Sequence, residues 1–189
     1  DGAELPSKLG TETHRATARA ENLKQGLAYH KAGDLENARK YCSRAVDITP
    51  AMTARLIHVL RDHRPNVKYV VAPYEADAQL AYLSMTNAVD AVISEDSDTI
   101  PYGCSDVIFK LDTNSMMCQR IVLNEIYLSY IKNFDLRSFN QEMMLSMCVA
   151  SGCDYLPSVS NYGIMKARKH AQRSKTPIKL LKMMRWEGL

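Results

Sequence analysis

The hydrophobic pattern of the first third of the chain is that of helices. A proline-free stretch from Arg15 to His30 is rich in alanine and charged residues, and Gly33-Asp34 after it provides a helix stop followed by an N-cap. A second helix is predicted from Leu35 to Ile48. Thr49-Pro50 then provides an N-cap and a first-turn proline, so a third helix is predicted to about Asp62.

The pattern changes to short β-rich runs in the middle of the chain. Val67–Ala72 is a predicted strand, Pro73 opens a predicted helix through Asn87, and Ala91–Ile93 is a second short apolar run. Because strand, helix and strand follow one another within about thirty residues, this segment is predicted to form a βαβ unit with parallel strands.

Two more strands are predicted at Val107–Leu111 and Gln119–Leu123, with a hairpin around Asp112–Asn114. The last third of the chain returns to helical patterns. The predicted helices are Leu123–Lys132, Phe139–Ser151, and two shorter ones from Gly163 and from Pro177. This order of elements favours the α/β class, with a mostly parallel central sheet flanked by helices.

Composition excludes several classes of protein. The chain has 189 residues, of which 46% are hydrophobic and 24% charged, and this excludes disordered, collagen-like and coiled-coil chains. No apolar run approaches the roughly 18 residues of a spanning helix, and no secretory leader is visible, so no membrane association is expected. The five cysteines match neither a zinc site nor a disulfide framework, which favours reduced thiols in a cytosolic or nuclear compartment.

Charge is distributed unevenly along the chain. Residues 1–70 carry 12 basic and 8 acidic side chains, residues 71–135 carry 3 and 10, and residues 136–189 carry 9 and 3. Two explanations fit this pattern equally well. One is solvated surface charge, and the other is an acidic metal site whose basic flanks hold a polyanion.

Two acidic clusters follow the predicted strands of the βαβ unit. Glu75 and Asp77 stand where the first strand leads into its helix, and Asp96 and Asp98 come directly after the second strand. Both clusters therefore fall at carboxyl ends of parallel strands, where open α/β sheets place their sites. In an extended segment, Asp96 and Asp98 would point the same way because they are two residues apart.

A third acidic position, Asp154, follows Gly152, which lets the chain turn back toward the sheet at the end of a helix. Considered alone, each acidic residue is also explained without a metal, as a residue in the first turn of a helix, in a loop or in a turn. Taken together, five carboxylates at an apolar sheet edge would repel one another without cations. Oxygen donors without His or Cys favour Mg²⁺ or Mn²⁺, and two such ions about 3.5–4 Å apart can cleave a phosphodiester. The predicted class is a metal-dependent phosphodiesterase.

Three motifs carry a resemblance to a known family. They are Ala72-Pro-Tyr-Glu-Ala-Asp-Ala-Gln79, Ser94-Glu-Asp-Ser-Asp98 and Ser151-Gly-Cys-Asp-Tyr155. These segments resemble the internal nuclease domain of the flap endonuclease family of 5′ nucleases, and the first looks most like the family's mismatch-repair exonuclease branch. Asp1-Gly2, Pro6-Ser-Lys8 and Arg15 match, in order, the end of the family's N-terminal motif.

The resemblance implies a role for each matching residue. The metal ligands, directly or through water, would be Asp1, Glu75, Asp77, Asp96, Asp98 and Asp154. Lys8 and Arg15 would lie on a helical arch above two Mg²⁺ ions, for which Mn²⁺ can substitute, and would contact the scissile phosphate. The other interpretation of these two residues is a solvated helix face. The arch would thread or clamp a single 5′ strand.

The resemblance also implies a helix-two-turn-helix over residues 158–169 that holds duplex DNA together with a bound K⁺. Its DNA-binding residues would be Ser158, Gly163, Lys166 and Lys169, with Ser158 as the side-chain ligand of K⁺. Where the family usually has Gly-Ile-Gly, this chain has Asn161-Tyr162-Gly163. Asn161 is the best substitute for a glycine at positive φ, whereas Tyr162 is expected to crowd the backbone near phosphate.

The expected organisation is a single nuclease domain over residues 1–189, truncated because the family's N-terminal strand lies before Asp1. Within it, residues 1–64 would hold the end of the N-terminal motif and the arch, 65–157 the nuclease core, and 158–189 the helix-two-turn-helix and a following helix. The expected function is a nuclear, monomeric, metal-dependent 5′-to-3′ exonuclease or 5′ flap nuclease in DNA repair. Its partners would be DNA 5′ ends, flaps, nicks or gaps, and mismatch-repair or replication proteins. The alternative is a nuclease-like DNA- or protein-binding module without catalysis.

Overall fold

The computed structural model describes residues 1–188, which fall into two compact units. One unit combines residues 1–4 with the chain from Ala72 onward, and the other comprises residues 5–71. We describe each unit by itself. The expected limits at residues 64 and 157 within one nuclease domain stay predictions.

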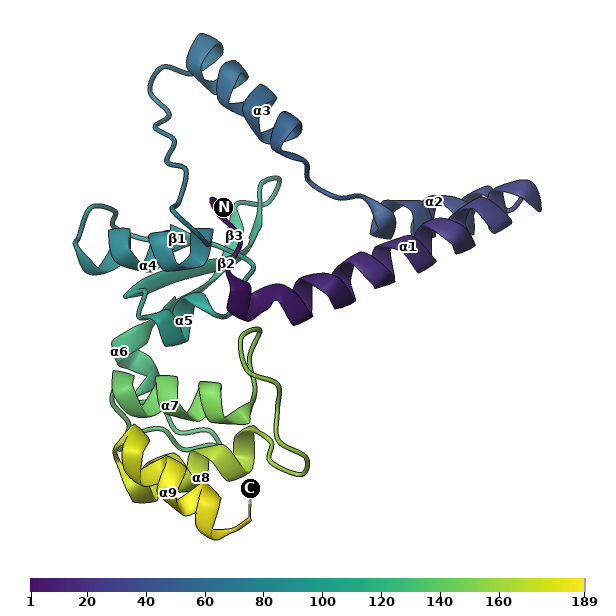
Figure 1. Cartoon of the computed structure of the whole chain (residues 1–189). Coiled ribbons are helices and arrows are strands. Elements are labelled where there is room, and N and C mark those ends of the chain that lie inside the picture. The colour runs from purple at the N-terminus through teal and green to yellow at the C-terminus, as the bar shows by residue number, and fades with distance from the viewer. Residues whose placement is uncertain (189) are drawn as a thin grey trace. The chain divides into compact units, whose positions relative to one another are not determined.

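The unit of residues 5–71 is helical, as predicted (Figure 1). Its elements are a 3₁₀ turn (Pro6–Lys8), α1 (Leu9–Lys31), α2 (Leu35–Ala45) and α3 (Pro50–His63). Both predicted N-caps are present, because the Asp34 carboxylate accepts a hydrogen bond from the Asn37 backbone and the Thr49 hydroxyl accepts one from the Met52 backbone. These side chains satisfy backbone donors that a helix start leaves unpaired.

The helices α1 and α2 pack against each other as a hairpin. The rings of Tyr29 and Tyr41 stack with centroids 5.3 Å apart, and Arg19 forms an ion pair of 3.2 Å with Asp47. At the crossing, Gly26 leaves room for Cys42, since a Cβ at Gly26 would lie 2.6 Å from the Cys42 sulfur. None of the helices in residues 1–188 is long and apolar enough to cross a membrane.

The second unit contains a small sheet covered by helices. Its strands are β1 (Val92–Ile93), β2 (Asp106–Asp112) and β3 (Met117–Val122) in that spatial order, with β1 parallel and β3 antiparallel to β2. The helices α4 (Ala76–Met85) and α5 (Thr99–Tyr102) lie beside the sheet (Figure 1). The buried core of this layer consists of Ala81, Val92, Cys104 and Val107.

A helical layer follows the sheet in the same unit. Its helices are α6 (Leu123–Ile126), α7 (Gln141–Ser151), α8 (Ile164–Ser174) and α9 (Pro177–Trp186). The Asn140 side chain caps α7 by accepting a hydrogen bond from the Met143 backbone at 2.9 Å. A methionine-rich core that includes Met147, Ala167 and Leu180 holds α7, α8 and α9 together. The predicted helices after Gly163 and from Pro177 are confirmed.

The α/β class is confirmed, whereas the expected sheet is only partly formed. The predicted strand Val67–Ala72 is wrong, because the segment is extended but pairs with no strand of residues 1–188, and most of its side chains are exposed. The described sheet consequently has one parallel and one antiparallel pairing rather than mostly parallel ones. The predicted helix Leu123–Lys132 stops at Ile126 because the following Leu128 and Tyr130 are exposed and find no core to pack against.

Candidate functional site

The first acidic motif lies at the start of α4. Glu75 is the N-cap residue of this helix and Asp77 lies in its first turn. Both carboxylates are half-buried, and negative charge is favoured there by the helix dipole. Burial, and then the charge of Asp77, raise the pKa of the nearby Cys104 thiol.

The N-terminal residues run alongside this motif within the same unit. The Gly2 backbone N–H donates to the Tyr74 carbonyl at 2.5 Å, and the Asp1 carboxylate accepts a hydrogen bond of 2.6 Å from the backbone of Ala76. A Cβ at Gly2 would lie 2.0 Å from the Ala72 carbonyl oxygen, so a larger residue cannot approach as closely. The fold thus places the carboxylate of Asp1 at the start of α4.

The second acidic motif forms a turn after β1. The Asp96 carboxylate accepts a hydrogen bond of 2.9 Å from the backbone of Asp98, and the Thr99 hydroxyl donates to the Asp96 carbonyl at 2.8 Å. This segment is therefore not extended, because the Asp96 side chain closes a local turn. Asp96 is exposed, whereas Asp98 is half-buried.

A pair of tyrosines connects the third motif to the first motif and to the end of α5. The hydroxyl of Tyr155, next to Asp154, donates a hydrogen bond to the carboxylate of Glu75 and lies 2.7 Å from the hydroxyl of Tyr102 at the end of α5. The turn that brings this segment back begins at Gly152, whose φ of 102° agrees with the predicted turn. Sequence reasoning did not assign Tyr102, because nothing local marks a tyrosine 53 residues away as a partner.

Asp98 and Asp154 line the same cavity. The cavity has a volume of about 740 Å³, and most of its other walls are apolar side chains of the helical layer, such as Phe134 and Met147. Cys148 also lines it, and burial together with the charge of Asp98 raises the pKa of its thiol to about 11. The cavity thus brings two carboxylates from the second and third motifs to an apolar pocket.

The donor set fits a hard cation, because the six carboxylates offer oxygen and no sulfur or imidazole. Three relationships connect four of them: Asp1 binds the start of α4 beside Glu75, Glu75 accepts a hydrogen bond from the neighbour of Asp154, and Asp154 shares a cavity with Asp98. Within residues 1–188, however, no three His, Cys, Asp or Glu side chains form a metal-binding group. The ligand assignments stay predictions.

Comparisons with known proteins agree with these motifs. Residues 66–154 match the XPG I-region family. The chain is 42% identical to Exonuclease 1 of Oryza sativa subsp. japonica over 189 residues, and 42% identical to Exonuclease 1 of Arabidopsis thaliana over 186 residues. It covers 22% and 25% of those two proteins, so it spans about a quarter of their length. These similarities relate the chain to the flap endonuclease family, most clearly over residues 66–154.

Solved structures of the family have a similar fold. Flap endonuclease-1 from Methanococcus jannaschii superposes with a TM-score of 0.60 at 32% identity, over 80% of this chain and 45% of that one. The catalytic core of Rad2 in complex with DNA substrate gives a TM-score of 0.65 at 18% identity, over 100% of this chain and 51% of that one. The second comparison concerns the fold alone.

The two basic residues that the family resemblance singles out lie in the other unit. Lys8 is the N-cap residue of α1, and Arg15 follows on the same helix, which runs through Gly10. The Arg15 guanidinium pairs with the Glu12 carboxylate at 2.9 Å. Contact of Lys8 and Arg15 with a scissile phosphate stays a prediction.

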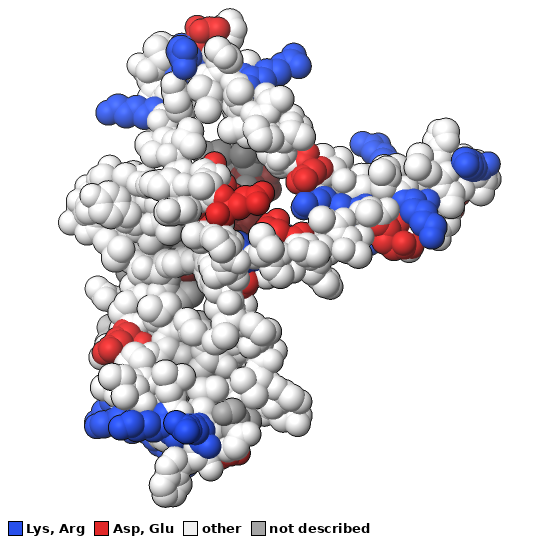
Figure 2. All heavy atoms as spheres, viewed as in Figure 1, with Lys and Arg blue, Asp and Glu red and all other residues white. Residues whose placement is uncertain are grey.

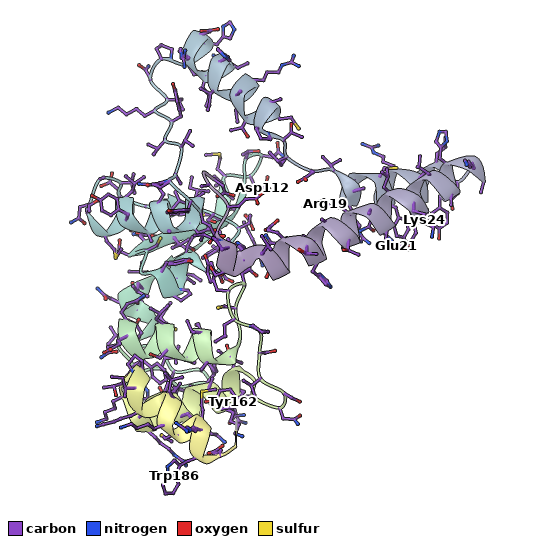
Figure 3. All side chains as sticks on the ribbon, viewed as in Figure 1. Arg19, Glu21, Lys24, Asp112, Tyr162 and Trp186 are labelled. Carbon is purple, nitrogen blue, oxygen red and sulfur yellow. The ribbon has the colours of Figure 1, made fainter. Side chains whose placement is uncertain are left out.

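The resemblance implies a helix-two-turn-helix in the segment between α7 and α8. Asn161 has a φ of 60°, as expected for the residue that replaces a glycine there. The expectation for Tyr162 is wrong, because its side chain is buried in the helical core instead of crowding the backbone (Figure 3). Ser158 and Gly163 are exposed, and Gly163 is the N-cap residue of α8. Their roles in DNA and K⁺ binding stay predictions.

A polar network below this segment was missed by sequence reasoning. The Tyr162 hydroxyl lies 2.9 Å from Nδ1 of buried His170, whose Nε2 lies 3.1 Å from the Glu187 carboxylate. Lys166, a predicted DNA contact, also pairs with Glu187 at 3.1 Å, and this hydrogen bond lowers the pKa of the Glu187 carboxyl. Lys169 is exposed on α8. Lys166 and His170 lie on α8, whereas Glu187 follows α9, so the sequence could suggest this network only once α8 and α9 were known to pack against each other.

Proposed function

We propose that this chain forms the nuclease region of a divalent-metal-dependent 5′ nuclease that hydrolyses phosphodiester bonds of DNA. Its similarity to flap endonuclease-1 and to Exonuclease 1, which are nucleases by name, supports this proposal. The observation that carries the proposal is that the three acidic motifs lie in one unit, where the Tyr155–Glu75 hydrogen bond and the cavity shared by Asp98 and Asp154 connect them.

The proposed cofactor is a pair of Mg²⁺ ions, for which Mn²⁺ can substitute. Asp1, Glu75, Asp77, Asp96, Asp98 and Asp154 would hold them, directly or through water. When bound, such ions activate a water molecule and stabilise the leaving oxygen. Lys8 and Arg15 would add positive charge at the non-bridging oxygens of the phosphate, where negative charge develops in the transition state.

The C-terminal part would hold the duplex portion of the substrate. Lys166 and Lys169 would contact phosphates, and Ser158 would bind K⁺ in the helix-two-turn-helix. A junction-resolving GEN-1 structure described as binding potassium, 28% identical to this chain, supports the K⁺ proposal. We propose that the whole protein acts on DNA 5′ ends, flaps, nicks or gaps in nuclear DNA repair, as a monomer with mismatch-repair or replication partners.

Cleavage of 5′-labelled DNA tests this function. We expect the protein to degrade recessed or flapped DNA with Mg²⁺ and to stop when the metal is chelated. Asp98→Asn should lower the single-turnover rate by at least a hundredfold, comparable to the loss of one transition-state donor. Asp90→Asn removes a charge from the same acidic block and should leave the rate unchanged. DNA binding without metal-dependent cleavage in the unmodified protein would contradict the proposal and favour the non-catalytic binding module.

A further inference from the structure

Trp186 is the sole tryptophan of the chain, and its side chain is almost completely exposed. It ends α9, and 93% of the residue's surface is accessible to solvent. In Figure 3 the ring projects from the end of the helix, away from the other elements of its unit. Moving an indole ring out of water lowers the free energy. Such exposure therefore indicates a binding site where the surroundings also favour a ligand.

The helix that carries this ring is held firmly in place. Leu180 and Met184 on its opposite face are buried in the methionine-rich core shared with α7 and α8. Directly after Trp186, the Glu187 carboxylate binds Lys166 and His170, each at 3.1 Å. The ring is therefore presented by a fixed element, and a ligand that uses it does not have to order the helix first.

Two lysines share the face of Trp186. Lys182 and Lys179 precede Trp186 by four and seven residues, so the three side chains lie on one side of α9 and are exposed. With a rise of about 1.5 Å per residue, the lysines stand about 6 and 10 Å along the axis from the ring. A shallow hollow beside the ring is lined by Lys182, Met183, Trp186 and Glu187.

The charge around this face suits a polyanion. The segment from Ser158 to Arg185 carries eight Lys and Arg residues and no acidic residue, and Figure 2 shows basic side chains gathered at this end of the chain. Glu187 is the acidic exception at the hollow, and its carboxylate is engaged by Lys166. A ligand in which a flat ring is followed in one direction by negative groups would match the indole and the two lysines, which lie in a row.

We propose that Lys179, Lys182 and Trp186, the α9 face, bind single-stranded DNA, with an unpaired base stacked on the indole and the backbone phosphates beside the lysines. Basic side chains interleaved with an aromatic ring are the recognition elements of proteins that bind single strands, because every base offers a π-face. Bases inside a duplex have both faces covered, so the ligand is a single strand. This inference rests on the proposed action on DNA but concerns a surface apart from the acidic motifs.

An anionic membrane is the main competing occupant, since basic residues beside a tryptophan also bind lipid headgroups. An interfacial helix needs its apolar face free, however, and the apolar face of α9 is buried in the protein core. The exposed large apolar side chains of α9 are those of Ile178, Leu181 and Trp186, and they leave little area for insertion. The observations therefore favour the nucleic acid, and vesicles become an arm of the test.

Intrinsic fluorescence tests the proposal directly, because all tryptophan emission of the chain comes from Trp186. A short single-stranded oligonucleotide should quench this emission saturably, and added salt should weaken the effect. A labelled oligonucleotide measures affinity for variants by anisotropy. Trp186→Leu should weaken binding about fivefold to a hundredfold, as expected for loss of one stacked base, whereas Trp186→Phe should retain most of the affinity. Ile178→Ala, an exposed apolar truncation on the same helix, should have no effect.

Three results would overturn the proposal. They are oligonucleotide binding without quenching, equal affinity of Trp186→Leu and the unmodified chain, and a blue shift on anionic vesicles without any response to the oligonucleotide. The Asp98→Asn variant separates this inference from the proposed function. It should lose cleavage and keep the quenching, and quenching in a chain that never cleaves DNA would contradict the nuclease proposal alone.

Discussion

At the scale of single residues, Gly152 decides how the third acidic motif reaches the others. Its φ is 102°, and a Cβ there would lie 2.7 Å from the Cβ of Ser158. We expect Gly152→Ala to lower the free energy of unfolding by about 1–3 kcal/mol, because it adds both strain and a steric clash. Urea denaturation measures this change.

The matched control is Gly163→Ala. Gly163 has a negative φ and nothing within 4 Å of the place a Cβ would take, so its replacement should change the free energy of unfolding by less than about 1 kcal/mol. Equal losses at the two glycines would contradict the role given to the Gly152 turn.

Cys148 reports on the cavity that Asp98 and Asp154 share. With a pKa of about 11, raised by burial and by Asp98, about one thiol in a thousand is ionised at pH 8. Alkylation followed by mass spectrometry should find Cys148 far slower than exposed Cys118 at pH 8, with its rate rising as the pH approaches 11. Comparable rates at pH 8 would mean that the cavity is open to water and the thiol is not shielded.

At the scale of elements, the sequence predicted those that local signals define. The caps of α2 and α3, the strands β2 and β3 with their hairpin, and the turn at Gly152 follow from side chains next to them in sequence. Val67–Ala72 was mispredicted because a strand also needs a partner strand, which its own composition does not reveal. The carboxylates of the candidate site stand in local sequence motifs, and their role as ligands stays a prediction, whereas Tyr102 and Glu187 depend on contacts between distant segments.

The helix α8 presents two lysines in different situations. Lys166 is paired with Glu187, whereas Lys169 is exposed, so Lys169 is the readier phosphate contact. We expect Lys169→Ala to reduce the slope of log affinity against log salt for duplex DNA by about one, and Lys166→Ala to reduce it less. Fluorescence anisotropy at several salt concentrations measures both slopes. An unchanged slope for Lys169→Ala would leave that lysine as a solvated surface residue.

At the scale of the whole molecule, carboxylates that are far apart in sequence converge on one unit. The N-terminal residues supply Asp1, α4 carries Glu75 and Asp77, the loop after β1 carries Asp96 and Asp98, and the chain after α7 carries Asp154. Only folding brings these segments together, and their mutual repulsion is offset when cations bind. A divalent cation should therefore bind the folded chain and stabilise it.

A titration with Mn²⁺, followed by calorimetry and by the melting temperature, tests this cation binding most directly. We predict that Mn²⁺ binds and raises the Tm of the unmodified chain and of Asp90→Asn, and that Asp96→Asn combined with Asp98→Asn abolishes both effects. The same binding and the same rise of Tm in that double variant would contradict the assignment of these carboxylates to a metal centre.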